Sequence, residues 1–333
     1  MKPEELSALH SVFEEPFDVY KKRKDFISPS DIKGCKTPKQ YQYKKEHPEE
    51  FTETRDTLLG NYFHTLVLEP NKIETEYAIW NEDMKPYPDS NYQNKANKTA
   101  RERFMAEAAL AGKKCLAKEI TDTAKAMFEV AKESESYMHI FDGANGICEY
   151  SFLACAKFYF GQEETGDPEK FFKVEILNIK EAANIPENRR LLLKCRPDYV
   201  SKITTYIADV KTSITASPIK NGFEAQAFKM EYHIQSAMYI DIIAAAVGKD
   251  PDDYDFYFGA IEKEPPYDNM VFACLAQSEY IEFGRKQYQT RLAQIKMAQN
   301  RNKYKSYDIY SSLDGGICLL GIPAYAKYDE IKF

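Results

Sequence analysis

The sequence predicts an α/β or α+β fold that is built on one central sheet. Segments with helical periodicity alternate with strand-like segments in the order helix, strands, helix, strands, helix. Of the 333 residues, 44% are apolar and 29% are charged, a composition typical of a folded chain and not of a disordered one. A chain of this length can bury a large core in one large domain or two small ones.

Residues 1–50 are polar and show no clear periodicity, so we predict an irregular segment there. It contains the basic run 21–24, whose simplest interpretation is a solvated patch. The sequence SPSD at 28–31 indicates a short helix that begins after Ser28 or Ser30, because serine side chains cap helix N-termini.

Helices are predicted where apolar residues recur at helical spacing or where Ala, Lys and Glu are enriched. They cover residues 52–68, 98–112, 116–136, 223–247 and 277–301. Pro70 ends the first of them, and residues 81–97 are expected to form a loop.

Strands are predicted where β-branched and aromatic residues concentrate. The sequences are ICEYSFLACAKFYF from Ile147, FFKVEILNI, LLLKCRPDYV, TTYIADVKTS, DYDFYFGAIE and MVFACLA. The third and fourth are separated by a short turn, so we expect them to pair as an antiparallel hairpin.

Charge and cysteine content narrow the function classes. Lys plus Arg is 45 and Asp plus Glu is 52, a net charge of −7, which argues against a protein that coats nucleic acid but not against an enzyme with a local basic channel. The seven cysteines include no CxxC pair, so a zinc ribbon or an iron–sulfur cluster is not expected. We expect reduced thiols, no secretion signal and no membrane span, and therefore a cytoplasmic protein.

The predicted hairpin carries the most informative side chains. Asp209 and Lys211 are two residues apart in one strand and therefore share a face. Asp198, in the adjoining strand, joins that face if the pairing matches an even-numbered residue with an odd-numbered one. Two carboxylates and one ammonium would then cluster among apolar strands.

Such a cluster is costly when partly buried unless it is neutralised, and a divalent cation would neutralise it. Carboxylate oxygens suit Mg²⁺ or Mn²⁺, and a lysine beside the metal can orient or deprotonate a water molecule. The D-x-K pattern alone favours the simpler alternative, a surface hairpin with an Asp–Lys ion pair. The Arg-Pro-Asp sequence on the adjoining strand shifts the balance towards a metal site.

RPDYV, DVKT and a helix with YHIQSAMY, in this order, resemble the RecE-type branch of the PD-(D/E)XK nuclease superfamily, to which the lambda-type exonucleases are more distantly related. Upstream, GNYFHTLVLEP resembles the family's G-x-x-x-H-x-L helix, and CEYSF resembles the strand that supplies an extra glutamate. The resemblance covers about residues 60–239. It implies a restriction-endonuclease-like PD-(D/E)XK core, with a central mixed sheet flanked by helices and a helical insertion. The DVKT sequence has aspartate where the superfamily usually has glutamate, a known variation within this branch.

The resemblance implies a role for each matching residue. Lys211 would be the catalytic lysine beside the attacking water, and Gln235 and Tyr232 would contact the scissile region or its phosphate. Asp198 could be shared by two ions, and Glu149 would complete a second metal site. The implied metal ligands, of which the three acids also count as catalytic, are Asp198, Asp209, the Val210 carbonyl, Glu149 and His64.

Taken without the resemblance, several of these residues have simpler interpretations. His64 lies in an apolar stretch and could be a core histidine with a hydrogen-bond partner. The spacing around Glu149 leaves open whether its side chain points into the site or lies at an edge. Tyr232 and Gln235 are three apart and share a helix face, as packing residues often do. Arg196 could bind a DNA phosphate with both guanidinium nitrogens, or pair with an acid.

The activity implied by the resemblance is that of a Mg²⁺-dependent exodeoxyribonuclease, with two ions that Mn²⁺ could replace. It would hydrolyse linear double-stranded DNA from its ends, 5′ to 3′, and leave 3′ single-stranded tails for recombination of the phage or prophage type. The implied partners are DNA ends, a RecT-like single-strand annealing protein and further copies of the chain in a homo-oligomeric ring.

Two alternatives remain. One is another PD-(D/E)XK nuclease of repair or CRISPR systems, although the four-cysteine cluster of the Cas4-like and AddB-like members is absent. The other is a non-catalytic DNA-binding subunit on the same scaffold, against which the complete set of Asp198, Asp209 and Lys211 argues. For domain organisation we predict an N-terminal segment at 1–50, a nuclease domain at 51–301 with a helical insertion at about 81–142, and a C-terminal extension at 302–333.

Overall fold

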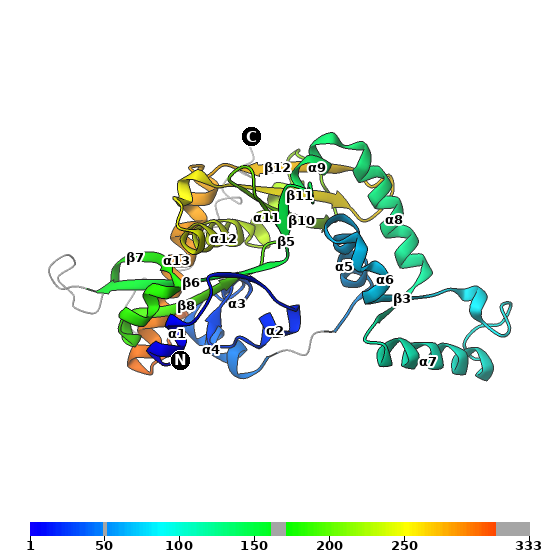
Figure 1. Cartoon of the computed structure of the whole chain (residues 1–333), viewed down its shortest axis with the longest axis horizontal. Helices are drawn as coiled ribbons and strands as arrows, with labels where there is room; N and C mark the ends of the chain where they lie inside the picture. Colours follow the sequence, from blue (N-terminus) through cyan, green and yellow to red (C-terminus); the bar gives the residue numbers. More distant parts are fainter. Residues whose placement is uncertain (49–51, 161–170, 311–333) are drawn as a thin grey trace, which may run out of the picture.

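The computed structural model describes residues 1–48, 52–160 and 171–310 (Figure 1). Helices and strands alternate along these residues as predicted, and the mixed α/β class is confirmed. The predicted central mixed sheet is present and contains the hairpin, but it is not the only sheet: the strands in the described parts of the chain form two five-stranded sheets and one two-stranded sheet. No helix in these parts is long and apolar enough to cross a membrane. The six cysteines within them are free thiols, and Cys318 lies outside them.

The first five-stranded sheet contains the predicted hairpin. Its strands are, in spatial order, β12 (Asn269–Cys274), β11 (Asp255–Glu262), β10 (Tyr206–Ser213), β9 (Tyr199–Ser201) and β5 (Gly146–Cys148). β10 and β11 are parallel and the other pairs are antiparallel, so the sheet is mixed. β9 and β10 pair Tyr199 with Ala208 and Val200 with Ile207, the even-with-odd register on which a shared face for Asp198 and Asp209 depends.

The second five-stranded sheet shares two runs of chain with the first. Its strands are β1 (Val12–Glu14), β6 (Tyr150–Phe160), β8 (Arg190–Cys195) and β2 (Phe26–Ile27), with β7 (Phe171–Asn178) paired to β6. β5 continues into β6 after Glu149, and β8 continues into β9 after residues 196–198. The continuous strand predicted from Ile147 is therefore broken at Glu149, whose φ of 58° lies in the left-handed region and ends regular pairing. The break in the other run lies beside it, since the Glu149 N–H donates to the Asp198 carbonyl at 3.3 Å.

Helix α12 (Tyr232–Val247) forms the centre of the core. Most of its residues are buried, and it packs against β6, β7 and β8 on one side and against α13 (Glu279–Arg301) on the other. The sequence predicts one helix over 223–247, but the structure has two, α11 (Phe223–Lys229) and α12, separated at Glu231, which has a φ of 55°. Gly284 allows α13 to approach α12, because a Cβ there would lie 2.0 Å from the His233 carbonyl oxygen.

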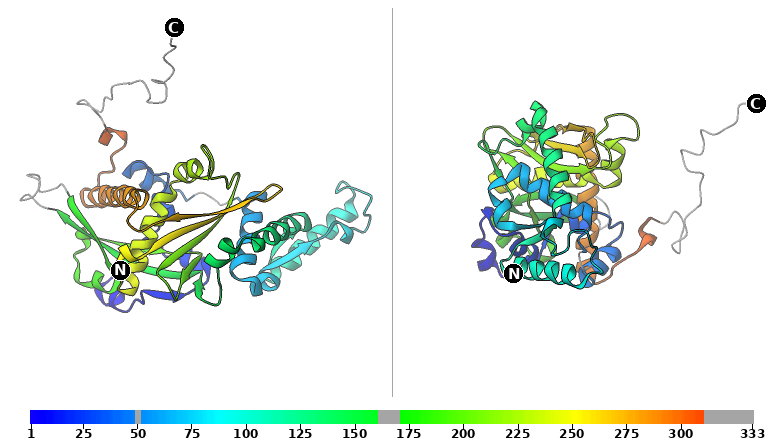
Figure 2. Two further views of the ribbon diagram at one scale, coloured as in Figure 1. Left: turned by 90° about the horizontal axis from the view of Figure 1, so that it is seen from above. Right: turned by 90° about the vertical axis from the view of Figure 1, so that its right-hand side faces the viewer.

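A mainly helical region lies beside the first sheet. α5 (Arg55–Leu68), α8 (Lys118–Glu133) and α9 (Glu135–Ile140) pack over it. α5 and α8 lie close to predicted helices, whereas α9 was not predicted. α7 (Lys95–Leu110) and the two-stranded sheet of β3 (Tyr77–Trp80) and β4 (Lys114–Ala117) form an arm that projects from the body (Figures 1 and 2). These two strands were not predicted, and β4 occupies the start of the helix expected from residue 116.

The N-terminal segment is more regular than the sequence predicts. Six short elements lie within residues 1–48: α1 (Pro3–Ser7), β1, α2 (Phe17–Lys22), β2, α3 (Pro29–Ile32) and α4 (Pro38–Glu46). They are too short to show a period, and β1 and β2 depend on partners far along the chain, in β6 and β8. Ser28, one of the two serines predicted to cap a helix here, is the N-cap of α3. The end of the predicted C-terminal extension, residues 311–333, lies outside the described residues.

Candidate active site

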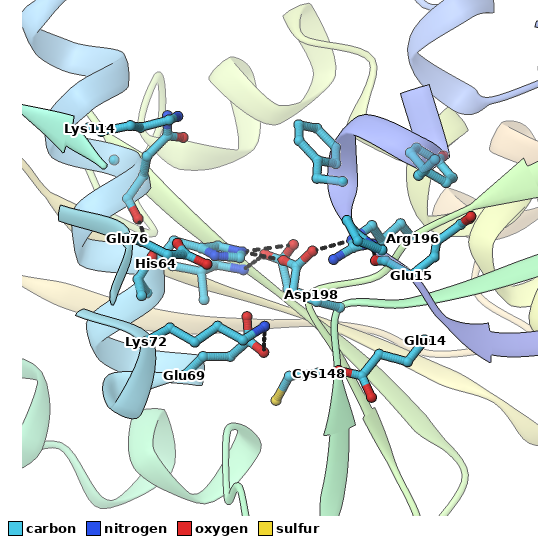
Figure 3. Close-up of a pocket in the computed structure, with 18 of the residues that line it drawn as sticks. Glu14, Glu15, His64, Glu69, Lys72, Glu76, Lys114, Cys148, Arg196 and Asp198 are labelled. Carbon is cyan, nitrogen blue, oxygen red and sulfur yellow. Dashed lines mark hydrogen bonds and ion pairs between the residues drawn. The ribbon is translucent and has the colours of Figure 1, made fainter. Parts of the chain in front are cut away.

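Two acids and a histidine meet where two runs of chain leave one sheet and enter the other. Glu149 follows β5 and Asp198 precedes β9, at the point where both runs of chain pass from one sheet to the other. His64 reaches them from α5, and its Nε2 lies 3.0 Å from Asp198 Oδ1 (Figure 3). The same nitrogen lies 3.3 Å from Glu149 Oε1. One ligand atom from each of these three residues lies within 4.8 Å of the other two.

Gly60 explains how α5 comes close enough to supply His64, which lies one helical turn further on. A Cβ at Gly60 would lie 3.1 Å from the Thr212 Oγ1 atom on β10, tighter than most such contacts. The absence of a side chain therefore allows the helix to approach the strand that carries Asp209 and Lys211.

The charges of the cluster shift the pKa of each member. Burial alone would lower the pKa of His64, but the carboxylates of Asp198 and Glu149 outweigh it and raise the value to about 9. Burial raises the pKa of Glu149, against the opposing effects of His64 and Arg196. For Asp198 burial is outweighed by His64, Lys211 and the Val210 N–H, which lower its pKa. Without a metal, protonated His64 and the Arg196 guanidinium, which pairs with Glu149, therefore both offset the charge of the two acids.

Asp209 lies next to this cluster, but it faces a different set of partners. Its side chain is 2% exposed, its Oδ1 accepts from Gln235 Nε2 at 2.9 Å, and its Oδ2 forms an ion pair with Lys211. Burial and the charge of Asp198 raise the pKa of Asp209 to about 6, although Lys211 opposes the shift. The Lys211 ammonium lies 4.8 Å from the centre of the Tyr232 ring.

The structure thus brings all the predicted site residues into one neighbourhood, in two groups. His64, Glu149 and Asp198 converge on a common point, whereas Asp209, Lys211, Gln235 and Tyr232 form an adjoining polar cluster. Val210 joins the groups through its N–H, which donates to Asp198 Oδ2 at 2.7 Å. The predicted roles of these residues remain predictions.

Arg196 pairs with an acid in this structure, the second of its two interpretations. Its Nε donates to Glu149 Oε2 at 2.5 Å and its Nη1 donates to the Glu15 carbonyl at 2.6 Å. The side chain is 9% exposed, so the guanidinium supports Glu149 and is largely shielded from a phosphate. A direct contact with DNA remains a prediction.

Lys33, which no sequence motif singles out, is brought to the site by the N-terminal segment. Its Nζ donates to Gln235 Oε1 at 3.2 Å and lies 5.0 Å from the centre of the Tyr232 ring. Burial and the nearby Lys211 lower the pKa of Lys33 to about 8. No spacing within the segment identifies this lysine, because its partners are some 200 residues away along the chain. Only the capped helix start at Ser28 indicates that the segment has a fixed structure here.

The converging residues line an open cavity of about 980 Å³, and Lys211 also lines it. Two carboxylates and an imidazole form a donor set that can bind a divalent cation: the carboxylate oxygens suit Mg²⁺ or Mn²⁺, and the imidazole nitrogen favours transition metals. Their arrangement fits a divalent cation, because a charge of +2 would stabilise two partly buried carboxylates more than a single protonated imidazole does. His64, Glu149 and Asp198 would hold it.

One family model matches part of the chain. Residues 179–307 match the family described as a PDDEXK-like domain of unknown function (DUF3799), a range that includes Asp198, Asp209, Lys211 and Gln235. This match and the mixed α/β structure confirm the restriction-endonuclease-like fold and support the PD-(D/E)XK superfamily, but not its RecE-type branch. No curated protein sequence is significantly similar to the chain.

Among solved structures, a candidate exonuclease from Eubacterium rectale is similar, with 12% sequence identity and a TM-score of 0.49. The match covers 96% of this chain and 99% of the other.

Proposed function

We propose that this protein is a metal-dependent nuclease that hydrolyses phosphodiester bonds of DNA. The observation that carries the proposal is the convergence of His64, Glu149 and Asp198 within 4.8 Å, beside the Asp209–Lys211 ion pair. The family match over residues 179–307 supports it, because the matched range contains the carboxylates and the lysine of the hairpin.

Each residue has a chemical task in this proposal. Glu149, Asp198 and neutral His64 would bind a divalent cation, which would supply a Lewis acid and an activated water. Lys211 would orient the attacking water and offset the charge that develops on the phosphate. Asp209 would hold the Lys211 ammonium in place, and Gln235 would hold Asp209 through its amide.

The finer specificity that we propose comes from the resemblance to RecE-type exonucleases. The substrate would be linear double-stranded DNA, digested 5′ to 3′ to give 3′ tails for recombination of the phage type. The reaction would use two metal ions, Mg²⁺ or Mn²⁺. A homo-oligomeric ring, a RecT-like annealing partner and a cytoplasmic location belong to the same proposal. Sedimentation of the purified chain with and without duplex DNA tests the ring.

The central experiment is cleavage of linear duplex DNA with Mg²⁺ by the parent chain, Lys211→Ala, Asp198→Asn and the control Lys39→Met. Lys39 is an exposed lysine of α4 that lies outside the site. The two site variants should lose cleavage while the control retains it. Metal-dependent cleavage that survives in both site variants would refute the assignment.

Substrate form and polarity are tested separately. An exonuclease should degrade linear duplexes and leave covalently closed circles intact, and a 5′ to 3′ enzyme should release a 5′ label before a 3′ label. Cleavage of closed circles would favour an endonuclease, and early release of the 3′ label would reverse the polarity. Binding of DNA without any cleavage would favour the non-catalytic subunit.

A further inference from the structure

The side-chain amide of Gln235 lies between two charged groups that need opposite ends of it. Its Nε2 donates to Asp209 Oδ1 at 2.9 Å, and its Oε1 accepts from Lys33 Nζ at 3.2 Å. An ionised carboxylate can only accept and a lysine ammonium can only donate, so the two partners together allow one orientation of the amide. Asp209 alone favours the nitrogen end of the amide, and Lys33 adds a second contact that fixes the oxygen end on the opposite side.

The backbone on both sides of Lys33 is held by one buried ion pair, that of Glu231 with Arg291. Glu231 Oε2 accepts from the Gly34 N–H at 2.6 Å, and Glu231 also pairs with Lys36. Arg291, on α13, binds both oxygens of Glu231 at 2.8 and 2.9 Å and donates to the Ile32 carbonyl at 3.0 Å.

The same carboxylate fixes the start of the helix that carries Gln235. Glu231 precedes α12 directly, is 7% exposed, and adopts the left-handed backbone conformation. The pair of Glu231 and Arg291 therefore sets the position of both partners in the Lys33–Gln235 hydrogen bond.

We infer that Lys33 is a positioning residue that fixes the amide of Gln235 against Asp209 and thereby holds Asp209 towards Lys211. This inference rests on the proposed nuclease function for its effect on cleavage. Its structural part, that Lys33 acts through Gln235, holds independently of any activity.

A double-mutant cycle tests the inference. The variants are Lys33→Met, Gln235→Met and the double variant, with Lys39→Met as the matched control. Loss of a residue that orients an active-site group typically costs roughly 10- to 100-fold in activity. Lys33→Met should lower kcat by about that factor with little change in KM, and should cause little further loss in the Gln235→Met background. Lys33→Arg retains a donor and should recover part of the lost kcat.

The second readout is the midpoint of urea unfolding of the metal-free chain, measured for the same variants. If Lys33 acts through Gln235, the midpoint shifts of the single variants will not add in the double variant. Additive shifts overturn the inference, and so does a multiplicative loss of kcat in the double variant. A parent chain without metal-dependent cleavage would refute the proposed function, whereas the urea cycle would still decide the inference.

Discussion

Replacing Lys33 by methionine should change how the stability of the folded chain depends on pH. Burial is the main cause that lowers the pKa of Lys33 from 10.5 to about 8, and the charge of Lys211 adds to it. The carboxylates of Asp209 and Glu231 partly offset the shift. The Tyr232 ring and the Gln235 amide are the neutral groups that face its ammonium. The folded chain therefore releases this proton at a lower pH than the unfolded chain.

The sign follows from the number of protons bound in each state. Between about pH 8 and pH 10.5 the unfolded chain still carries the proton of Lys33 and the folded chain has lost it, so this group makes the free energy of unfolding rise with pH. Below about pH 8 both states are protonated and the contribution is constant. At about 1.4 kcal/mol for each pKa unit, the rise amounts to about 3 kcal/mol over this range.

The assay is urea unfolding of the parent and of Lys33→Met at intervals from pH 7 to pH 10.5. The unfolded chain also releases protons from its tyrosines and cysteines in this range, but these contributions are common to both proteins and cancel in the difference. The free energy of unfolding of the parent minus that of the variant should increase by about 3 kcal/mol as the pH rises from 8 to 10.5. A difference that stays constant from pH 8 to pH 10.5 would refute the close packing of residues 29–36 on α12.

Three further predictions concern the contact between α12 and α13 and the proposed metal ligands. Glu231→Gln leaves Arg291 without its buried counter-charge and should lower the free energy of unfolding by about 3–5 kcal/mol; a urea-measured loss below about 1 kcal/mol, as for exposed pairs, would contradict this. The control Asp241→Asn disrupts another buried acid–arginine pair between α12 and α13, so it should also destabilise the chain but should spare the cleavage that Glu231→Gln reduces. Gly284→Ala places a Cβ against the backbone of α12 and should cost at least about 1–3 kcal/mol, and an unchanged Tm in calorimetry would argue against the close helix contact. Glu149→Gln should weaken Mn²⁺ binding in titration calorimetry at least about tenfold, and binding equal to that of the parent would remove Glu149 from the ligand set.

The parts of the fold that could be predicted are those whose signal lies within one segment. The helices α5 and α13 carry their apolar periodicity over 14 and 23 residues, and both lie close to their predicted ranges. The β9–β10 hairpin follows from two apolar runs around a short turn, and its register is the one that a shared face for Asp198 and Asp209 requires. Residue type and local spacing were sufficient in these cases.

The remaining features depend on contacts between distant segments. β2 is two residues long and exists because Phe26 and Ile27 pair with β8, some 165 residues away, so no local pattern could indicate it. The approach of Lys33 to Gln235 depends on the same docking of the N-terminal segment. The division into two sheets could not be read either, because Glu149 lies inside a run of strand-forming residues and its left-handed backbone has no signature in the sequence.

Two glutamates near the site lie in the left-handed region, where glycine would fit at lower cost: Glu149, between β5 and β6, and Glu231, between α11 and α12. Glu149 and Glu231 have φ values of 58° and 55°, and such strain in a non-glycine residue costs on the order of 1 kcal/mol or more. In each case the carboxylate is used: Glu149 faces His64 and Arg196, and Glu231 binds Arg291. A glycine could make the same turns but could supply neither an acid to the cluster of His64, Glu149 and Asp198 nor an anchor for the start of α12. The strain is therefore best understood as a consequence of placing an acid where the chain must also turn, and it links the break between the two sheets to the chemistry of the site.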